Sequence, residues 1–251
     1  MTEFPQEDPL RQIYRESFVE NPKHQKDLSN RDTALLCIDM QYLDAAEGYG
    51  LFKDYESSPI PLEEMRYYFD RLRDTVLPNV HNLQNCFRQH GLEVIHVRIQ
   101  SLTQDGRDRS KGHKRLELHA APGSGEACFL EEVAPVGDEI IINKTASGVF
   151  SSTNLHYVLS NLGISSLYVV GVYTNECVET TVRVACDLGY LVTMVDDCCA
   201  TQTPELHDAS LKTLRNRYAR IVSTTEAIAD VESLVAMSNQ TFGVTPEPIT
   251  P

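Results

Sequence analysis

The residue whose type and position most clearly indicate reactivity is Cys177, which lies where a predicted strand is followed by a predicted helix. Residues Ser166 to Val172 are apolar and rich in β-branched side chains, as in a strand buried on both faces. Apolar or small side chains then recur every three or four residues, and Gly189 stands where a helix cap is expected. A thiol in the first turn of a helix lies near the positive end of the helix dipole, which favours the nucleophilic thiolate. This placement makes Cys177 a candidate nucleophile.

Two further residues could complete a site with this thiol. Asp39 ends the apolar run that starts at Thr33, and Lys144 follows the run Glu139–Asn143. Cys177 would attack a planar carbonyl and form a thioacyl intermediate. Asp39 would take the thiol proton, pass it to the leaving nitrogen and later deprotonate a water, while Lys144 would orient Asp39 and balance its charge. Each residue alone has a structural alternative, as a core thiol, a turn cap or a surface lysine, but the joint pattern favours a site.

The elements that must position these residues alternate between strands and helices. Six strands are predicted, which are Thr33–Asp39, Leu92–Val97, Glu139–Asn143, Ser166–Val172, Tyr190–Val195 and Arg220–Ser223. Helical patterns separate them, except that a long polar loop joins the second strand to the third. This alternation predicts right-handed crossovers and a parallel sheet covered on both faces. Ligands of such sheets bind beyond the carboxyl ends of the strands, where the three candidate residues all fall.

Polar segments flank and interrupt this body. We expect residues 1–31 to form an N-terminal arm, residues 32–242 to form one domain, and residues 243–251 to form a disordered tail. Two long loops are expected inside the domain, at residues 42–61 and 100–135.

Composition and charge exclude several classes of partner. The chain has 251 residues, enough for one large α/β domain, and a formal charge of -14. Negative charge repels phosphate backbones and anionic lipid, so we expect neither nucleic acid nor a membrane surface as partner. No apolar run approaches the roughly 20 residues of a membrane helix, and the first thirty residues lack the apolar core of a signal peptide. Seven cysteines without a Cys-x-x-Cys pair argue against a disulfide framework and for a reducing, cytoplasmic setting.

Three segments resemble a known family. Ile38–Gln41, Asn143–Lys144 and above all Gly171–Thr181 are similar to the isochorismatase-like cysteine hydrolases, which include nicotinamidases, N-carbamoylsarcosine amidohydrolase, ureidoacrylate hydrolase and biuret hydrolase. The resemblance covers residues 32 to 225. It implies a three-layer αβα Rossmann-like fold with a mostly parallel six-stranded sheet, a hydrolase domain within residues 32–242, and a homodimer or homotetramer. It also implies a catalytic triad of Asp39, Lys144 and Cys177.

The resemblance has further implications for the chemistry. It implies a non-proline cis peptide bond between Val172 and Tyr173, which would aim the backbone amides of Tyr173 and Cys177 at the oxyanion. Because Cys177 is present, the chain resembles the members that cleave C–N bonds more than those that cleave a vinyl ether and can act without the thiol. Nicotinamidases bind a metal through an acid and histidines after the first strand. Here the first histidine after Asp39 is His81, within a predicted helix, so we predict no metal and no cofactor.

Candidates for substrate binding come mainly from basic residues. The loop Asp105–Arg115 could bring Arg107 or Arg109 to a substrate carboxylate, unless it is a solvated loop or a subunit contact. Arg98, at the end of the second strand, points toward the same edge. Three more candidates come from other segments: Gln41, Asn175 and Phe150. Gln41 could instead stabilise its loop, and Phe150 could belong to the core.

These patterns together predict a cysteine amidohydrolase that cleaves a small amide or ureido/carbamoyl compound through a thioacyl-enzyme and releases ammonia. Three alternatives stay open. The chain could be a vinyl ether hydrolase of the isochorismatase type, or a non-catalytic binding scaffold on the same fold. Redox sensing through Cys177 or Cys198 is the third, although no resolving partner is identifiable.

Overall fold

The structure is a computed structural model that describes residues 32–54, 56 and 58–241. The N-terminal arm predicted for residues 1–31 and the tail predicted for residues 243–251 lie outside the described residues.

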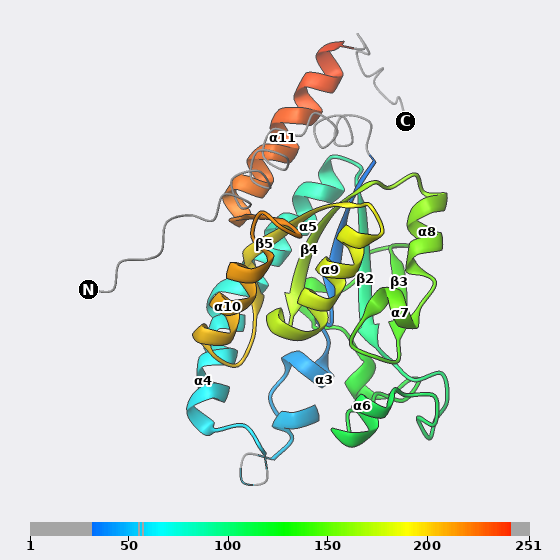
Figure 1. The fold of residues 1–251 in the computed structure, drawn as a ribbon, viewed down its shortest axis with the longest axis vertical. Coiled ribbons are helices and arrows are strands. Elements are labelled where there is room, and N and C mark those ends of the chain that lie inside the picture. Colours follow the sequence, from blue (N-terminus) through cyan, green and yellow to red (C-terminus); the bar gives the residue numbers. More distant parts are fainter. Residues whose placement is uncertain (1–31, 55, 57, 242–251) are drawn as a thin grey trace, which may run out of the picture.

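A single sheet of six parallel strands forms the centre of the molecule, in the order β3-β2-β1-β4-β5-β6 (Figure 1). The strands are β1 Thr33–Ile38, β2 Glu93–Ile99, β3 Ile140–Lys144, β4 Ser166–Val172, β5 Leu191–Ala200 and β6 Arg220–Val222. Every residue of β1 and β4 is buried, which is why both read as continuous apolar runs. The strand order reverses between β1 and β4, and the carboxyl ends of these two strands are where a ligand of such a fold binds.

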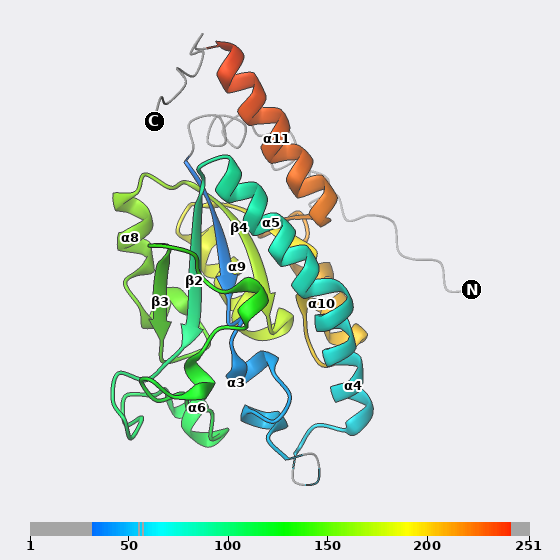
Figure 2. The same ribbon diagram turned by 180° about the vertical axis from the view of Figure 1, so that it is seen from behind.

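Helices cover both faces of this sheet. One face carries α4 Leu62–Arg71, α5 Leu77–Gln89 and α11 Thr224–Thr241, and the other carries α7 Val149–Ser152, α8 Leu155–Asn161, α9 Glu179–Asp187 and α10 Pro204–Leu214 (Figures 1 and 2). Two short helices, α3 Tyr42–Ala45 and α6 Lys111–Arg115, lie near the carboxyl ends of the strands. The predicted three-layer α/β architecture is confirmed, and the sheet is parallel throughout rather than mostly so.

Helix boundaries follow the local signals in the sequence. Gly163 and Gly189, which follow the α8 and α9 regions, have positive φ angles of 74° and 93°, so each helix ends at a glycine, as predicted for Gly189. Pro78 falls within a long helical stretch, residues 62–89. It lies at the start of α5, directly after a π-helical turn at Leu72–Val76, where its missing N–H breaks no regular helix bond.

Several elements differ from the sequence predictions. Helix α11 was not predicted, and short helices interrupt both predicted loops: α3 in the first, and α6 with the 3₁₀ turns Gly125–Ala127 and Glu131–Val133 in the second. Strand β5 continues five residues beyond its predicted end at Val195. It can do so because the carboxylates of Asp196 and Asp197 have partners, which are His207 and the amide and hydroxyl of Thr224.

Candidate active site

Asp39, Lys144 and Cys177 meet at the carboxyl ends of β1, β3 and β4. The Lys144 ammonium lies 2.9 Å from Oδ2 of Asp39 and donates a hydrogen bond of 3.2 Å to the Cys177 sulfur. It also donates to the carbonyl of Ala146 at 3.1 Å. The three side chains are nearly sealed from solvent, with exposed fractions of 1%, 0% and 4%. The structure therefore brings together three groups from three separate segments of the sequence.

Asp39 reaches this position because the backbone turns sharply at the end of β1. Its φ angle is +53°, a left-handed conformation that is uncommon outside glycine, and its N–H donates to the carbonyl of Val97 on β2. The neighbouring strand approaches so closely that a Cβ at Gly171 would collide with the carbonyl of Ile38. A strained acid beside an obligatory glycine is typical of a functional strand end.

Cys177 lies on a π-helical turn, Thr174–Val178, that precedes α9. The carbonyl of Tyr173 accepts from the amides of Glu176 and Val178, at 3.1 and 3.2 Å, which closes the turn. The peptide bond between Val172 and Tyr173 is cis, as the family resemblance implied. The sequence predicted a regular helix start around the cysteine, and the wider π turn is the observed local structure.

Burial of the thiol disfavours a resting thiolate at Cys177, in contrast to the expectation from the helix dipole. Burial raises the pKa of Cys177 well above its usual value, against the opposing effect of Lys144. Burial likewise raises the pKa of Asp39, although Lys144 counteracts it. Burial alone would lower the pKa of Lys144, but the charge of Asp39 outweighs this effect and holds it above its ordinary value. At rest, Cys177 is therefore a protonated thiol and Lys144 is an ammonium. The Asp39 carboxylate binds a proton more readily than a carboxylate in water does.

Two buried ionisable residues beside the triad were not found from the sequence. The side chain of Asp44, on α3, is 2% exposed, and burial raises its pKa well above normal, with the Asp39 charge adding to the effect. His113, on α6, is 3% exposed, and burial together with the Lys144 charge lowers its pKa to about 4. Within the described residues, Nδ1 of His113 has no hydrogen-bond partner. Neither residue stands out in the sequence, because both lie in segments without periodicity.

The arginines of the basic loop are engaged within the loop itself. Arg107 is exposed and pairs with Asp105 at 3.2 Å. Arg109 donates to the carbonyls of Gly106 and Leu118, at 3.0 and 2.7 Å. The loop is joined to the site through a different contact, since the amide of Ser110, which caps α6, donates to the carbonyl of Thr145 next to Lys144. Substrate binding by Arg107 or Arg109 stays a prediction that would require these contacts to break.

Two other candidates support the scaffold around the site. Arg98 donates to Asn143 and to the carbonyl of Ala127, both at 2.8 Å, and lies over the ring of Phe129. Gln41 is fully buried. Its amide nitrogen donates to the carbonyls of Ile99 and Glu126, and its oxygen accepts from the amide of Ile99. These contacts match the loop-stabilising alternative for Gln41 and use both N–H donors of its amide.

Phe150 and Asn175 also occupy distinct places. Phe150 stacks on Tyr190 with ring centres 5.9 Å apart and packs against the core, as its alternative role implied. Asn175 lies on the Cys177 turn, and its side-chain oxygen accepts from the hydroxyl of Thr201 at 2.5 Å. Of the predicted substrate residues, Asn175 is therefore the one that shares the turn of the nucleophile.

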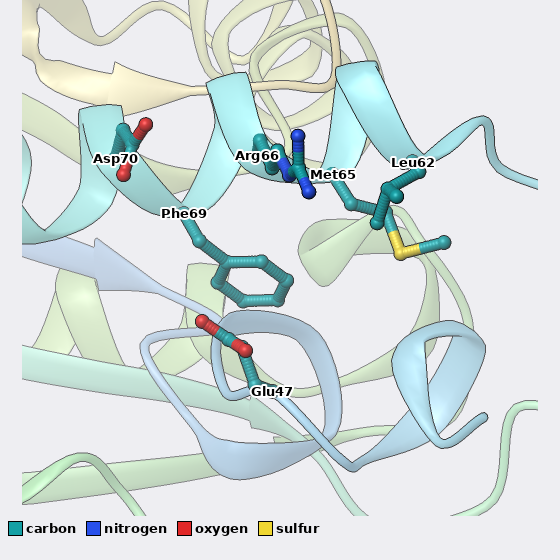
Figure 3. A pocket seen from close by; sticks show the side chains of 6 residues that line it. All are labelled: Glu47, Leu62, Met65, Arg66, Phe69 and Asp70. Atoms are coloured by element: carbon teal, nitrogen blue, oxygen red, sulfur yellow. The ribbon is translucent and has the colours of Figure 1, made fainter. Parts of the chain in front are cut away.

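A separate pocket of about 430 Å³ lies on α4 and is lined by Glu47, Leu62, Met65, Arg66, Phe69 and Asp70. Figure 3 shows the Phe69 ring pointing from the helix toward Glu47. No triad residue lines this pocket.

No group of three His, Cys, Asp or Glu side chains is placed to hold a metal ion within the described parts of the chain. Among the same residues, no helix is both long and apolar enough to cross a membrane.

Comparison with known proteins finds similar proteins over most of the chain. A probable inactive nicotinamidase of Arabidopsis thaliana is 31% identical over 195 residues, covering 74% of this chain and 89% of that protein. The ureidoacrylate amidohydrolase of Acinetobacter baylyi is 25% identical over 214 residues, covering 78% and 82%. The crystal structure of a cysteine hydrolase from Pseudomonas syringae superposes with a TM-score of 0.66 at 21% identity, covering 81% and 94% of the two chains. The model of the isochorismatase domain matches residues 33–226, and the chain therefore belongs to the isochorismatase family of hydrolases.

Proposed function

We propose that this hydrolase is a cysteine amidohydrolase that cleaves the C–N bond of a small amide or ureido/carbamoyl compound and releases ammonia. The contact of Lys144 with both Asp39 and Cys177, at 2.9 and 3.2 Å, is the observation that carries the proposal. Burial leaves the thiol protonated at rest, so the reaction needs a base beside it. The raised pKa of Asp39 suits a group that must accept a proton and then return it.

The first half of the reaction forms the acyl-enzyme. Asp39 takes the proton of Cys177 while the sulfur attacks the substrate carbonyl carbon, and backbone amides of Tyr173 and Cys177 donate to the oxyanion. Asp39 then gives its proton to the leaving nitrogen, the C–N bond breaks, and ammonia departs. Lys144 stays charged throughout and stabilises the negative charge that passes between the carboxylate and the sulfur.

The second half releases the acid. Asp39 takes a proton from a water molecule as the water oxygen attacks the thioester carbon. The C–S bond then breaks and the proton returns to the sulfur of Cys177. One water is consumed for each ammonia and each carboxylic acid or carbamate formed, so the enzyme ends in its starting state.

The proposal is tested with Cys177→Ala and Cys177→Ser, scored by ammonia release on biuret, ureidoacrylate-like, N-carbamoyl amino acid and aromatic amide substrates. Cys186→Ala is the matched control, because Cys186 is a half-buried thiol near the C-terminal end of α9. We expect activity in the wild type and the control and loss of at least about 10³-fold in both Cys177 variants. Full activity of Cys177→Ala would remove the thioacyl mechanism, and cleavage of isochorismate by that variant would favour ether hydrolysis. Absence of ammonia release from every substrate would favour a binding scaffold.

Assembly and location are part of the same proposal. We propose a homodimer or homotetramer that works in the cytoplasm on a small neutral or charged amide, without a metal or other cofactor. Sedimentation at several protein concentrations tests the assembly, and activity after dialysis against a chelator tests the absence of a metal. A concentration-independent monomer, or loss of activity that a divalent ion restores, would overturn the respective part.

A further inference from the structure

Three hydrogen-bonded polar side chains, Thr174, His207 and Asp196, lie beside the turn that carries Cys177, with His207 between the other two. His207 comes from α10 and is 4% exposed. Its Nδ1 lies 2.9 Å from the hydroxyl of Thr174, and its Nε2 lies 2.8 Å from Oδ1 of Asp196 on β5. Thr174 is fully buried and is the first residue of the π-helical turn that carries Cys177. None of these groups takes part in the proposed proton transfers.

The hydroxyl of Thr174 can both donate and accept, so its hydrogen bond with Nδ1 of His207 forms with either tautomer of the ring. On the other side of the ring, Nε2 lies within hydrogen-bond distance of the Asp196 carboxylate and of the Arg71 guanidinium. The bond to Nδ1 restricts the rotamer of Thr174.

Arg71 contacts His207 and Asp196 from the helical layer on the other face of the sheet. It reaches from α4, where its Nη2 lies 3.0 Å from Nε2 of His207 and 3.6 Å from Oδ1 of Asp196. Its Nε donates to the carbonyl of Cys199, the residue that pairs with Gly171 across β5 and β4. The histidine is thus held by elements from both helical layers and from the strand next to β4.

We propose that His207 is a positioning residue for Cys177. Through its bond to Thr174 it holds the start of the turn, and the turn in turn keeps the sulfur at 3.2 Å from the Lys144 ammonium. Loss of the bond would leave a buried hydroxyl or ring nitrogen unpaired, and the turn would shift to satisfy it. The consequence for turnover rests on the proposed function, whereas the consequence for the reactivity of the thiol does not.

The test compares Thr174→Val, Thr174→Ser and His207→Gln with His156→Gln. His156 makes an equivalent imidazole–hydroxyl bond, 2.8 Å to Tyr190, away from the Cys177 turn. We expect Thr174→Val and His207→Gln to lower kcat about 10- to 100-fold with KM changed less than about threefold, because a shift of about 1 Å in a reacting group is enough. Thr174→Ser should recover to within about threefold of the wild type, and His156→Gln should be unaffected.

A second readout does not depend on any substrate. The rate of Cys177 alkylation by iodoacetamide at pH 8, followed by mass spectrometry, should fall about tenfold in Thr174→Val and recover in Thr174→Ser, because Lys144 no longer favours the thiolate. A merely loosened fold would raise the rate by exposing the thiol. Unchanged kcat and unchanged alkylation in Thr174→Val, or a serine variant no better than the valine variant, would overturn the inference. If the wild type releases no ammonia from any amide, the proposed function fails while the alkylation comparison still decides the role of His207.

Discussion

Two carboxylates of this molecule, the buried Asp39 and the half-buried Glu139, have opposite surroundings. Glu139 accepts from both Nε and Nη2 of Arg88, at 2.7 and 3.0 Å, as well as from the Val136 amide, and it contacts His96 at 2.9 Å. Although burial alone would raise its pKa, these partners lower it. Asp39 is more deeply buried and is paired mainly with Lys144, so burial prevails and its pKa is raised.

This difference separates a structural acid from a reactive one. A carboxylate surrounded by donors is stabilised as the anion and becomes a poor base. A carboxylate that burial deprives of donors keeps a high affinity for a proton, which a catalytic base requires. The contrast can be tested at both residues by the same kind of substitution.

The largest effect is expected from Asp39→Asn compared with Glu139→Gln. Asp39→Asn should lower kcat/KM at least about 10³-fold, because the thiol then has no base. Glu139→Gln should leave kcat/KM within about threefold but lower the free energy of unfolding by about 2 kcal/mol, a value reduced for the partial exposure of this ion pair. Steady-state kinetics and urea unfolding of both variants provide the measurement. Equal losses of activity in the two variants would erase the distinction.

The close approach of β4 to the end of β1 predicts the next effect. Gly171→Ala should lower the free energy of unfolding by about 3 kcal/mol or more, because the added Cβ collides with the carbonyl of Ile38. Gly163→Ala is the control, since Gly163 also has a positive φ but no atom lies within 4 Å of its Cβ position. It should cost about 1 kcal/mol. Similar losses in the two variants, measured by thermal unfolding, would contradict the crowding at the strand end.

Acidification should lower the stability that Glu139 and His96 contribute to the fold. The folded pKa of Glu139 is lowered, so its stabilisation is present above the unfolded pKa and is lost as the pH falls through the folded value. The pKa of His96 is also lowered by burial, so protonating this histidine on acidification favours unfolding too. Stability should therefore decline from about pH 6 downward, and the decline should be shallower in Glu139→Gln. Parallel pH profiles of unfolding for variant and wild type would be inconsistent with this assignment.

The smallest effect is expected in the basic loop. Arg107→Gln should change kcat/KM less than about twofold, because its exposed pair with Asp105 contributes little. A rise in KM of tenfold or more, confined to substrates that carry a carboxylate, would instead support the sequence-based prediction that Arg107 binds substrate.

The sequence predicted the features that local patterns encode. Apolar runs ending at Asp39 and Lys144, and the strand-to-helix change at Cys177, were enough to place the three residues at one edge of a parallel sheet. The glycine stops of α8 and α9 were predictable for the same reason.

Contacts between distant segments could not be predicted in this way. The burial of Asp44 and His113 depends on loops folding over the strand ends, and neither loop has a periodic pattern. The extension of β5 depends on partners such as His207 that stabilise charged residues within a strand. The raised pKa of Cys177 was missed because the helix-dipole argument considered one element alone, whereas burial by the whole fold has the larger effect.

The central claim is that the sulfur of Cys177 becomes acylated during turnover while Asp39 moves the proton. Intact-mass spectrometry of enzyme quenched within the first turnovers tests this most directly, followed by mapping of the modified peptide. The account predicts a mass increase equal to the acyl part of the substrate, located on Cys177 and absent from Asp39→Asn. Continued ammonia release without any adduct, together with an active Cys177→Ala variant, would contradict it.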